Sequence, residues 1–160
     1  MTDISKGKGV IKMREQVSAV FSSHHDAVEA ARRVKDAGLR TSDISVIANE
    51  DVARSPDSVS TGAISGTALG GAAGLLLGLG TVAIPGLGVV AAAGPIAGLL
   101  SGAVTGGVVG AMVDLGIPAE RSEEYSRDIK SGKTVWAMEV DREKADSVRE
   151  ILKDCGAIKI

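Results

Sequence analysis

Hydrophobic and polar positions follow the same succession of periods at the two ends of the chain. Residues 17–47, VSAVFSSHHDAVEAARRVKDAGLRTSDISVI, begin with a short apolar run that is typical of a strand, Val17–Phe21. Ser23 follows at the position of a helix N-cap, alanines recur behind it at helical spacing, and Gly38 ends the helix. The β-branched run Ile44–Ile47 predicts a second strand.

Residues 134–160 repeat this succession at the same spacing. Thr134–Val140 predicts a strand, Asp141 an N-cap, and Gly156 the end of a helix that leads into a last strand, Ala157–Ile160. Counted from the two caps, the first alanine, an aliphatic residue and the closing glycine fall at equal distances. Two such β-α-β units predict an α+β fold, a ferredoxin-like βαββαβ sandwich with a four-stranded antiparallel sheet and two helices on one face.

The pattern changes between these halves, because no charged residue occurs from Ser58 to Val113. This stretch holds most of the 21 glycines, and ten of them recur at every fourth position in two runs. Four residues turn a helix by about 400°, so each run places its glycines on one face, where a second helix can approach closely. We expect helix–helix or oligomer contacts at Gly62, Gly66, Gly70, Gly74, Gly78, Gly94, Gly98, Gly102, Gly106 and Gly110.

The uncharged stretch is therefore predicted to be a glycine-zipper helical hairpin inserted between the second and third strands. Pro85 and Gly86 are expected in its turn, and Pro95 as the first residue of its second helix. Residues 117–133 predict one extra helix that connects back to the third strand. The expected organisation is a mobile basic tail over 1–15, a split ferredoxin-like domain over 16–57 and 114–160, and the hairpin insertion over 58–113.

Such a hairpin would expose aliphatic faces even if its two glycine stripes packed on each other within one chain. We therefore expect lipid or further copies of the chain to cover it. Thr61–Leu79 and Pro95–Val113, each about 19 residues, would form about 28 Å of helix, close to the thickness of bilayer hydrocarbon. However, the flanking charges lean acidic, and no Trp or Tyr marks either interface. Membrane association and soluble homo-oligomeric assembly both remain open.

Composition and charge exclude some classes of partner. A net charge of -2 gives no reason to expect a nucleic-acid partner, and aromatic residues at 2% offer little surface for stacking on a ligand. The single cysteine, Cys155, excludes an internal disulfide. These features favour a cytoplasmic location or the cytoplasmic face of the inner membrane.

No arrangement of residues predicts an enzyme, a cofactor site or a metal site. Adjacent His24 and His25 point about 100° apart on a helix, so both are interpreted as solvated residues of its first turn. Cys155 is interpreted as a small buried residue at a helix end, and Glu123 and Glu124, with Tyr125, as a solvated helix face. The glycines of GLGTVAIPGLG lack the lysine that a phosphate-binding loop requires.

A different class of function rests on the expected fold alone. Small βαββαβ domains bind small ligands at a dimer edge or act as sensors, and Ile44–Ala48 with Lys133–Val140 would line such an edge. Nothing in the sequence specifies the small-molecule ligand. A small-ligand-binding regulatory module is thus the alternative to assembly or membrane insertion.

Several segments together resemble the YflT-type heat-induced and general stress proteins of bacteria. The segments that carry the resemblance are AVFSSHHDAVEAARRVKDAGL, DISVIA, AIPGLG, AAGPIAGLLSGAVTGG, LGIPAERSEEYSRDIKSG, KTVWAMEV and GAIKI, which together span about residues 16–160. The chain departs from the commoner AIPGIGP version, because Val89 stands in place of the proline. The resemblance implies a stress-induced, cytoplasmic or membrane-associated protein and brings no catalytic residues with it. We therefore expect a non-enzymatic stress-response protein whose hairpin drives membrane insertion or assembly.

Overall fold

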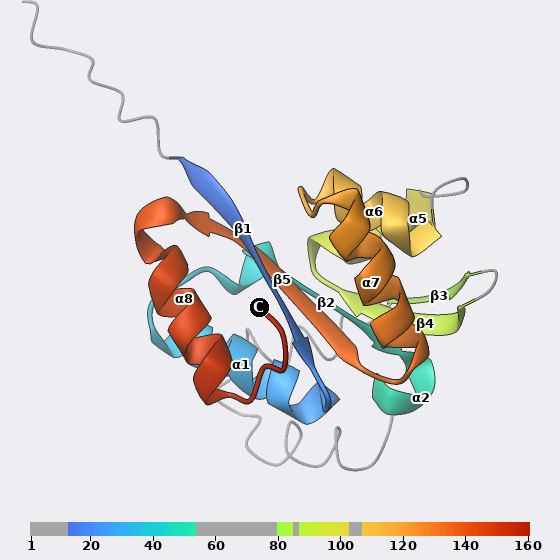
Figure 1. Ribbon diagram of the computed structural model, residues 1–160, viewed down its shortest axis with the longest axis horizontal. Helices are drawn as coiled ribbons and strands as arrows, with labels where there is room; N and C mark the ends of the chain where they lie inside the picture. The colour runs from blue at the N-terminus through green and yellow to red at the C-terminus, as the bar shows by residue number, and fades with distance from the viewer. Residues whose placement is uncertain (1–12, 54–79, 85–86, 103–106) are drawn as a thin grey trace, which may run out of the picture.

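The computed structural model describes residues 13–53, 80–84, 87–102 and 107–160, which form a mixed α+β fold, as predicted. Five strands build one antiparallel sheet in the order β1-β5-β2-β4-β3 (Figure 1). The strands are β1 (Arg14–Phe21), β2 (Ile44–Asn49), β3 (Gly80–Ile84), β4 (Gly88–Ala93) and β5 (Thr134–Asp141).

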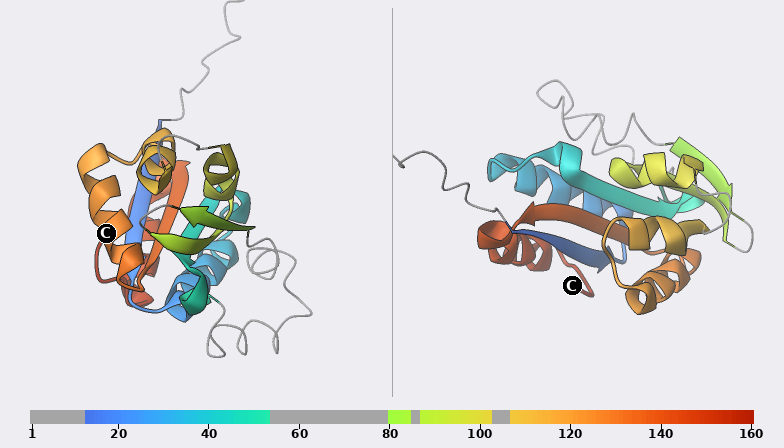
Figure 2. Two further views of the ribbon diagram at one scale, coloured as in Figure 1. Left: turned by 90° about the vertical axis from the view of Figure 1, so that its right-hand side faces the viewer. Right: turned by 90° about the horizontal axis from the view of Figure 1, so that it is seen from above.

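Helices lie on both faces of this sheet. The helices α1 (His24–Asp36) and α8 (Arg142–Asp154) cover one face, and α5 (Pro95–Gly102), α6 (Gly107–Asp114) and α7 (Ala119–Lys130) cover the other (Figures 1 and 2). The short helices η1 (Thr41–Asp43) and α2 (Glu50–Ala53) flank β2. We predicted helices on one face only, so the second helical layer is the main departure from the expected architecture.

The alternation of side chains along β5 shows how one strand serves both layers. Trp136 and Met138 belong to the core under α1 and α8, whereas Val135 and Ala137 belong to the core under α5, α6 and α7. Successive strand residues point to opposite faces, so a strand that is covered on both sides needs apolar residues at nearly every position. This explains the continuous run VWAM in the third predicted strand.

The local signals of both β-α-β units are confirmed. The Ser23 side chain accepts a hydrogen bond from the His25 backbone N at 3.2 Å, and Gly38 and Gly156 follow their helices with φ of 80° and 87°. Asp141 occupies the N-cap position of α8, although its side chain makes no capping hydrogen bond. The expected last strand is reduced to a single bridge between Val20 and Lys159, beside β1.

Residues 80–84 and 88–93, which we expected in the connection between the two helices of the hairpin, instead form two paired strands, β3 and β4. This pair of strands joins β2 through β4 and extends the sheet by two strands. Val89, the departure from the family pattern, pairs with Ala83 in its ladder. Pro85 and Gly86 lie between these strands but outside the described residues. The β-branched residues Thr81, Val82 and Ile84 in β3, and Val89 and Val90 in β4, suit a strand better than a helix.

The second predicted helix, Pro95–Val113, corresponds to two described helices on either side of residues 103–106, which lie outside the described residues. It begins at Pro95 as expected, but α5 ends at Gly102 and α6 begins at Gly107, whose φ is +55°. Within the ranges that the structure covers, no helix has the length and apolar character needed to cross a bilayer. Thr61–Leu79, the other expected span, lies outside the described residues, as do residues 1–12 of the predicted tail, whereas Arg14 and Glu15 already belong to β1.

The aliphatic side chains of α5 and α6 are buried against the protein's own sheet. Ile96, Leu100, Val108 and Met112 are at most 4% exposed and pack with residues of β1, β2 and β5. This corrects the expectation that the insertion cannot bury its aliphatic faces within one molecule, as far as the described residues of α5 and α6 are concerned. The second face of the sheet supplies the apolar surface that we had assigned to lipid or to sister subunits.

Helix α7 is fixed to the sheet and to the C-terminal segment by buried polar groups. The hydroxyls of Tyr125 and Ser18 lie 3.0 Å apart, and Tyr125 is 2% exposed, so its interpretation as part of a solvated face is wrong. The Asp128 carboxylate accepts hydrogen bonds from Lys133 Nζ at 2.7 Å and Lys159 Nζ at 2.8 Å. Glu124 also accepts from Lys159 Nζ, at 2.6 Å.

Candidate ligand pocket

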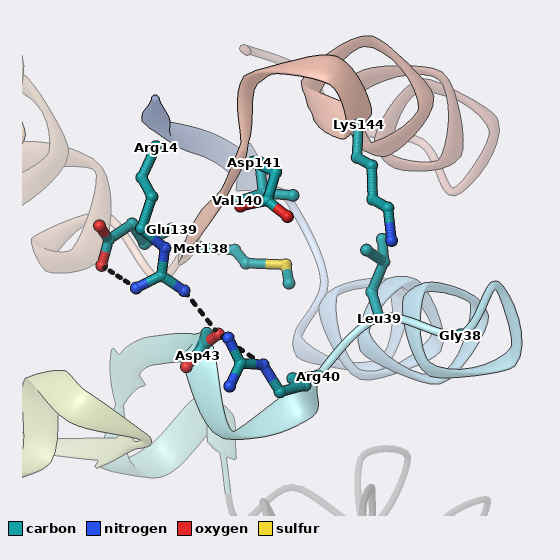
Figure 3. A pocket seen from close by; sticks show the side chains of 10 residues that line it. All are labelled: Arg14, Gly38, Leu39, Arg40, Asp43, Met138, Glu139, Val140, Asp141 and Lys144. Carbon is teal, nitrogen blue, oxygen red and sulfur yellow. Dashed lines mark hydrogen bonds and ion pairs between the residues drawn. The ribbon is translucent and has the colours of Figure 1, made fainter. Parts of the chain in front are cut away.

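A polar pocket of about 280 Å³ lies where β5 ends and α8 begins (Figure 3). Five elements or turns meet there: the start of β1, the turn after α1, the short helix η1, the end of β5 and the first turn of α8. Its ten lining residues are Arg14, Gly38, Leu39, Arg40, Asp43, Met138, Glu139, Val140, Asp141 and Lys144.

Two chain reversals place these side chains around the same space. Gly38, with φ of 80°, turns the chain out of α1, and its neighbour Leu39 donates its backbone N–H to Val34 O at 3.2 Å, so that Leu39 and Arg40 come to lie at the pocket rim. At the other reversal, Asp141 leads from β5 into α8, and Arg142 N donates to Met13 O at 2.9 Å. The amino end of α8 therefore opens beside the turn that follows α1 (Figure 3).

Arg14 is held by two carboxylates at one side of the pocket. Its Nη1 lies 3.3 Å from Glu139 Oε2, and its Nη2 lies 3.3 Å from Asp43 Oδ2 (Figure 3). All three side chains are between a quarter and about a half exposed, so each pair contributes at most about 1 kcal/mol to stability. The pairs fix the position of the guanidinium more than they stabilise the fold.

The other two cations of the pocket retain unused hydrogen-bond donors. Arg40 approaches Asp43 Oδ2 only through its Nε, at 3.6 Å, and its two Nη groups have no acceptor among the described residues. Lys144 forms no ion pair with any residue that the structure describes, and its ammonium extends toward Leu39 across the pocket (Figure 3). The floor is apolar, because Met138 and Val140 are 2% and 3% exposed and belong to the core.

A smaller pocket of about 140 Å³ shares Asp43 and Glu139 with the first but lies toward the other helical layer, next to Pro95 and Asp114. Ser45 lines this pocket, and its Oγ accepts a hydrogen bond from the Ile96 backbone N–H at 3.2 Å. Because Arg14 already holds both shared carboxylates, this pocket adds only Asp114 as a charged group without a described ion pair.

The structure separates the predicted glycine contacts into different roles. Gly94 has φ of +80°, and a Cβ at this position would lie 1.8 Å from Ile44 O, so its role is close contact between backbones. At Gly98 and Gly110 an added Cβ would meet no atom of the described residues within 4 Å, so neither position shows the close approach that is seen at Gly94. Gly102 ends α5. The remaining predicted contacts lie outside the described residues: Gly62, Gly66, Gly70, Gly74, Gly78 and Gly106.

His24 departs from its interpretation as a solvated residue. It is 2% exposed, and neither ring nitrogen has a hydrogen-bond partner among the described residues. Burial, with a smaller contribution from neighbouring His25, lowers the pKa of the His24 imidazole. The buried stripe of α1 begins with His24 and continues through Ala27, Val28 and Ala31, because positions three, four and seven residues apart share one helix face.

Cys155 agrees with its interpretation as a packing residue at a helix end. It is the chain's single cysteine and the C-cap of α8, and it is half-buried against the α1–α8 core. Burial raises the pKa of the Cys155 thiol, which disfavours the reactive thiolate.

The expected ligand-binding edge does not exist as such, because β2 and β5, which contain Ile44–Ala48 and most of Lys133–Val140, are central strands of the sheet. Only the end of the second range, Met138–Val140, reaches the pocket. Sequence reasoning missed Arg40 and Lys144 altogether. One local signal could have identified Lys144: it lies in the first turn of a predicted helix, where the helix dipole favours an acidic residue over a basic one.

The described residues contain no group of three histidine, cysteine or carboxylate side chains placed to hold a metal ion. Comparison of the chain with protein-family models, with curated proteins and with solved structures finds no match.

Proposed function

We propose that this protein is a non-enzymatic regulatory module that binds a small charged molecule in the pocket at the start of α8. The observation that carries the proposal is the pocket itself, in which a lysine with no ion pair among the described residues and a partly paired arginine lie above a buried apolar floor. Ligand sites combine an apolar lining with a few placed polar groups in this way. Its lining contains no cysteine, histidine, serine or threonine, and two of its three carboxylates, Asp43 and Glu139, already pair with Arg14, which favours binding over catalysis.

The arrangement of the strands supports a ferredoxin-like core for this module. With the bridge between Val20 and Lys159 counted as the edge, the sheet reads C-terminal segment, β1, β5, β2, which is the order of a split β-α-β pair. Both crossover helices, α1 and α8, lie on the same face. The β3–β4 hairpin and helices α5 to α7 then form an insertion between β2 and β5. The stress-response role rests on the resemblance of the sequence to the general stress proteins.

Ligand binding predicts a measurable rise in thermal stability. The full chain is heated with panels of small anionic, cationic and neutral metabolites, and the unfolding midpoint is followed by circular dichroism. A ligand at about 100 times its Kd stabilises the folded state by about 2.7 kcal/mol, which corresponds to several degrees for a chain of this length. If no class of metabolite raises the midpoint, the regulatory-module proposal is wrong.

Self-assembly is the second candidate function, and an open face on α6 favours it. Gly110 has no atom within 4 Å of an added Cβ, and Val113, three residues later on the same face, is 43% exposed. A glycine beside an exposed apolar residue permits close approach of a helix from a second copy of the chain. Membrane association through the described helices is not part of this proposal, because they are short and packed on the sheet.

Gly110→Leu should block this contact, since the leucine would occupy the space that the second helix needs. In sedimentation velocity we expect the wild-type chain and Gly110→Ala to sediment as an assembly, and Gly110→Leu to shift to the monomer. The alanine variant controls for helix propensity, which improves in both substitutions. A monomeric wild-type chain, or a leucine variant that assembles like wild type, would contradict the proposal.

A further inference from the structure

Resting on the ligand-binding function proposed above, we infer that the ligand is a small organic anion whose carboxylate or phosphate oxygens lie between Lys144 Nζ and the Arg40 guanidinium. Its carbon skeleton would lie on Met138 and Val140.

The balance of donors and acceptors in the pocket leads to this class of ligand. Asp43 already faces Arg14 and Arg40, Glu139 already faces Arg14, and the third carboxylate, Asp141, also has an interaction of its own. The donors that lack described acceptors are the Lys144 ammonium and the two Nη groups of Arg40. A ligand that supplies anionic oxygens satisfies these donors, whereas a cationic ligand would compete with Arg14 for carboxylates that are already paired.

Net charge does not attract the anion, because the formal charges of the pocket cancel. Arg14, Arg40 and Lys144 are opposed by Asp43, Glu139 and Asp141. Recognition must therefore come from the placement of the donors. At physiological ionic strength screening extends over about 8 Å, so we expect affinity to depend only modestly on salt compared with a site of large net charge.

The amino end of α8 adds a second favourable contribution beside these donors. The helix has 13 residues, its N-cap side chain makes no capping hydrogen bond, and Lys144 belongs to its first turn. The first-turn N–H groups of a helix have no intrahelical acceptors, and the dipole favours negative charge at this end. Only Arg142 N has a described backbone acceptor outside the helix, Met13 O at 2.9 Å.

Volume and floor restrict the size of the ligand. At about 280 Å³ the pocket lies just below the usual range for ligand sites, so it suits only a small metabolite with one or two charged groups. Met138 and Val140 line the pocket but are only 2% and 3% exposed, so they offer a small apolar surface that suits a short carbon skeleton. A short carbon chain with an anionic head has this shape.

Isothermal titration calorimetry on the full chain tests the inference with four probes. Succinate represents a carboxylate, glycerol 3-phosphate a phosphate monoester, inorganic phosphate the phosphate head alone, and putrescine a cation of similar length. We expect succinate or glycerol 3-phosphate to bind, inorganic phosphate to bind more weakly, and putrescine not to bind. The stronger of the first two identifies the head group.

The variants Lys144→Gln and Arg40→Gln should each weaken binding of the preferred anion about tenfold or more, since each removes a charge-assisted hydrogen bond. Both side chains are exposed at the rim, so the fold should be unaffected, which circular dichroism verifies. Lys153→Gln is the matched control: it removes the same charge from the last turn of α8, about 13 Å away, and should leave the affinity unchanged.

The outcomes separate this inference from the function on which it rests. Binding of putrescine but of neither organic anion would overturn the anion class and leave ligand binding standing. Anion binding that is equally strong in Lys144→Gln and Arg40→Gln would overturn the placement. Absence of binding by all four probes would overturn the inference, and the metabolite panel then decides separately whether the ligand-binding function also fails.

Discussion

Replacing Gly94 with alanine is expected to cost about 3 kcal/mol or more of unfolding free energy. Two effects add at this position. The residue has φ of +80°, which alanine adopts only with strain, and its Cβ would lie 1.8 Å from Ile44 O and 2.9 Å from Ile44 C. These are backbone atoms of β2 and cannot rotate away, so β4, the start of α5, or both must move. Urea unfolding followed by circular dichroism measures the loss.

Gly110→Ala is the matched control for this prediction. Gly110 lies in the second glycine run as well, but in α6, with open space around an added Cβ and no positive φ. We expect this variant to gain about 1 kcal/mol from improved helix propensity. If the two substitutions had equal effects, Gly94 would not make the close contact with β2 on which the path of the insertion depends.

Asp128→Asn is expected to lower the unfolding free energy at pH 7 by about 2 kcal/mol. The Asp128 side chain is 8% exposed and accepts from both Lys133 and Lys159, whereas an amide would satisfy neither ammonium as well. The two lysines are about a third exposed and can be rehydrated, which keeps the loss below that of a fully buried pair. Asp146→Asn, in an ion pair with Arg149 but 93% exposed, should change stability by less than about 0.5 kcal/mol.

The same carboxylate predicts a pH dependence. Burial alone would raise the pKa of Asp128, but hydrogen bonds from Lys133 and Lys159 outweigh it and hold the pKa below its ordinary value of 3.8. Because the folded pKa is the lower one, the stabilisation is complete well above 3.8 and is lost as the pH falls through the folded pKa. The low-pH loss should be smaller in Asp128→Asn, and an unchanged acid limb would contradict this assignment.

Protonation of His24 causes a second loss of stability on acidification, which begins at a higher pH than the loss caused by Asp128. The pKa of His24 is lowered from 6.5 in the folded state, so its effect also appears on acidification but begins near pH 6.5. The two acid transitions are thus distinguished by the pH at which each begins.

The elements that could be predicted from the sequence are those with local signals. Ser23 as N-cap, Gly38 and Gly156 as stops, and Pro95 at the first position of a helix are each decided by groups within a few residues. The two matching β-α-β units followed from these signals and from the period of the apolar residues, without any tertiary information.

The path of the insertion could not be predicted in this way. In residues 80–113 glycine, alanine and valine dominate, and their spacing fits a helix face and a strand face equally well. What decides the outcome is tertiary: β2 has a free edge that β4 can pair with, and the sheet has an apolar second face with Val20, Ile47 and Val135 that α5 and α6 can cover. Neither property is visible in the insertion itself.

The candidate pocket could not be predicted from the sequence for a related reason. Arg14, Arg40, Glu139 and Lys144 are separated by up to 130 positions and share no motif, and only the sheet order brings β1 beside β5. The sequence predicts Arg14 in the tail, because basic residues precede it. In the structure its backbone lies opposite that of Asp141, at the first position of the β1–β5 ladder.

The central claim is that β4 belongs to the protein's own sheet and that α5 and α6 belong to the helical layer on its second face. Amide hydrogen exchange on the purified chain in detergent-free buffer, read by mass spectrometry, tests it most directly. We predict that peptides from β4, α5 and α6 are protected to a degree comparable with β1 and β5, and that adding lipid vesicles leaves this protection unchanged. Rapid exchange of these peptides in buffer, with protection appearing only when vesicles are added, would contradict the account.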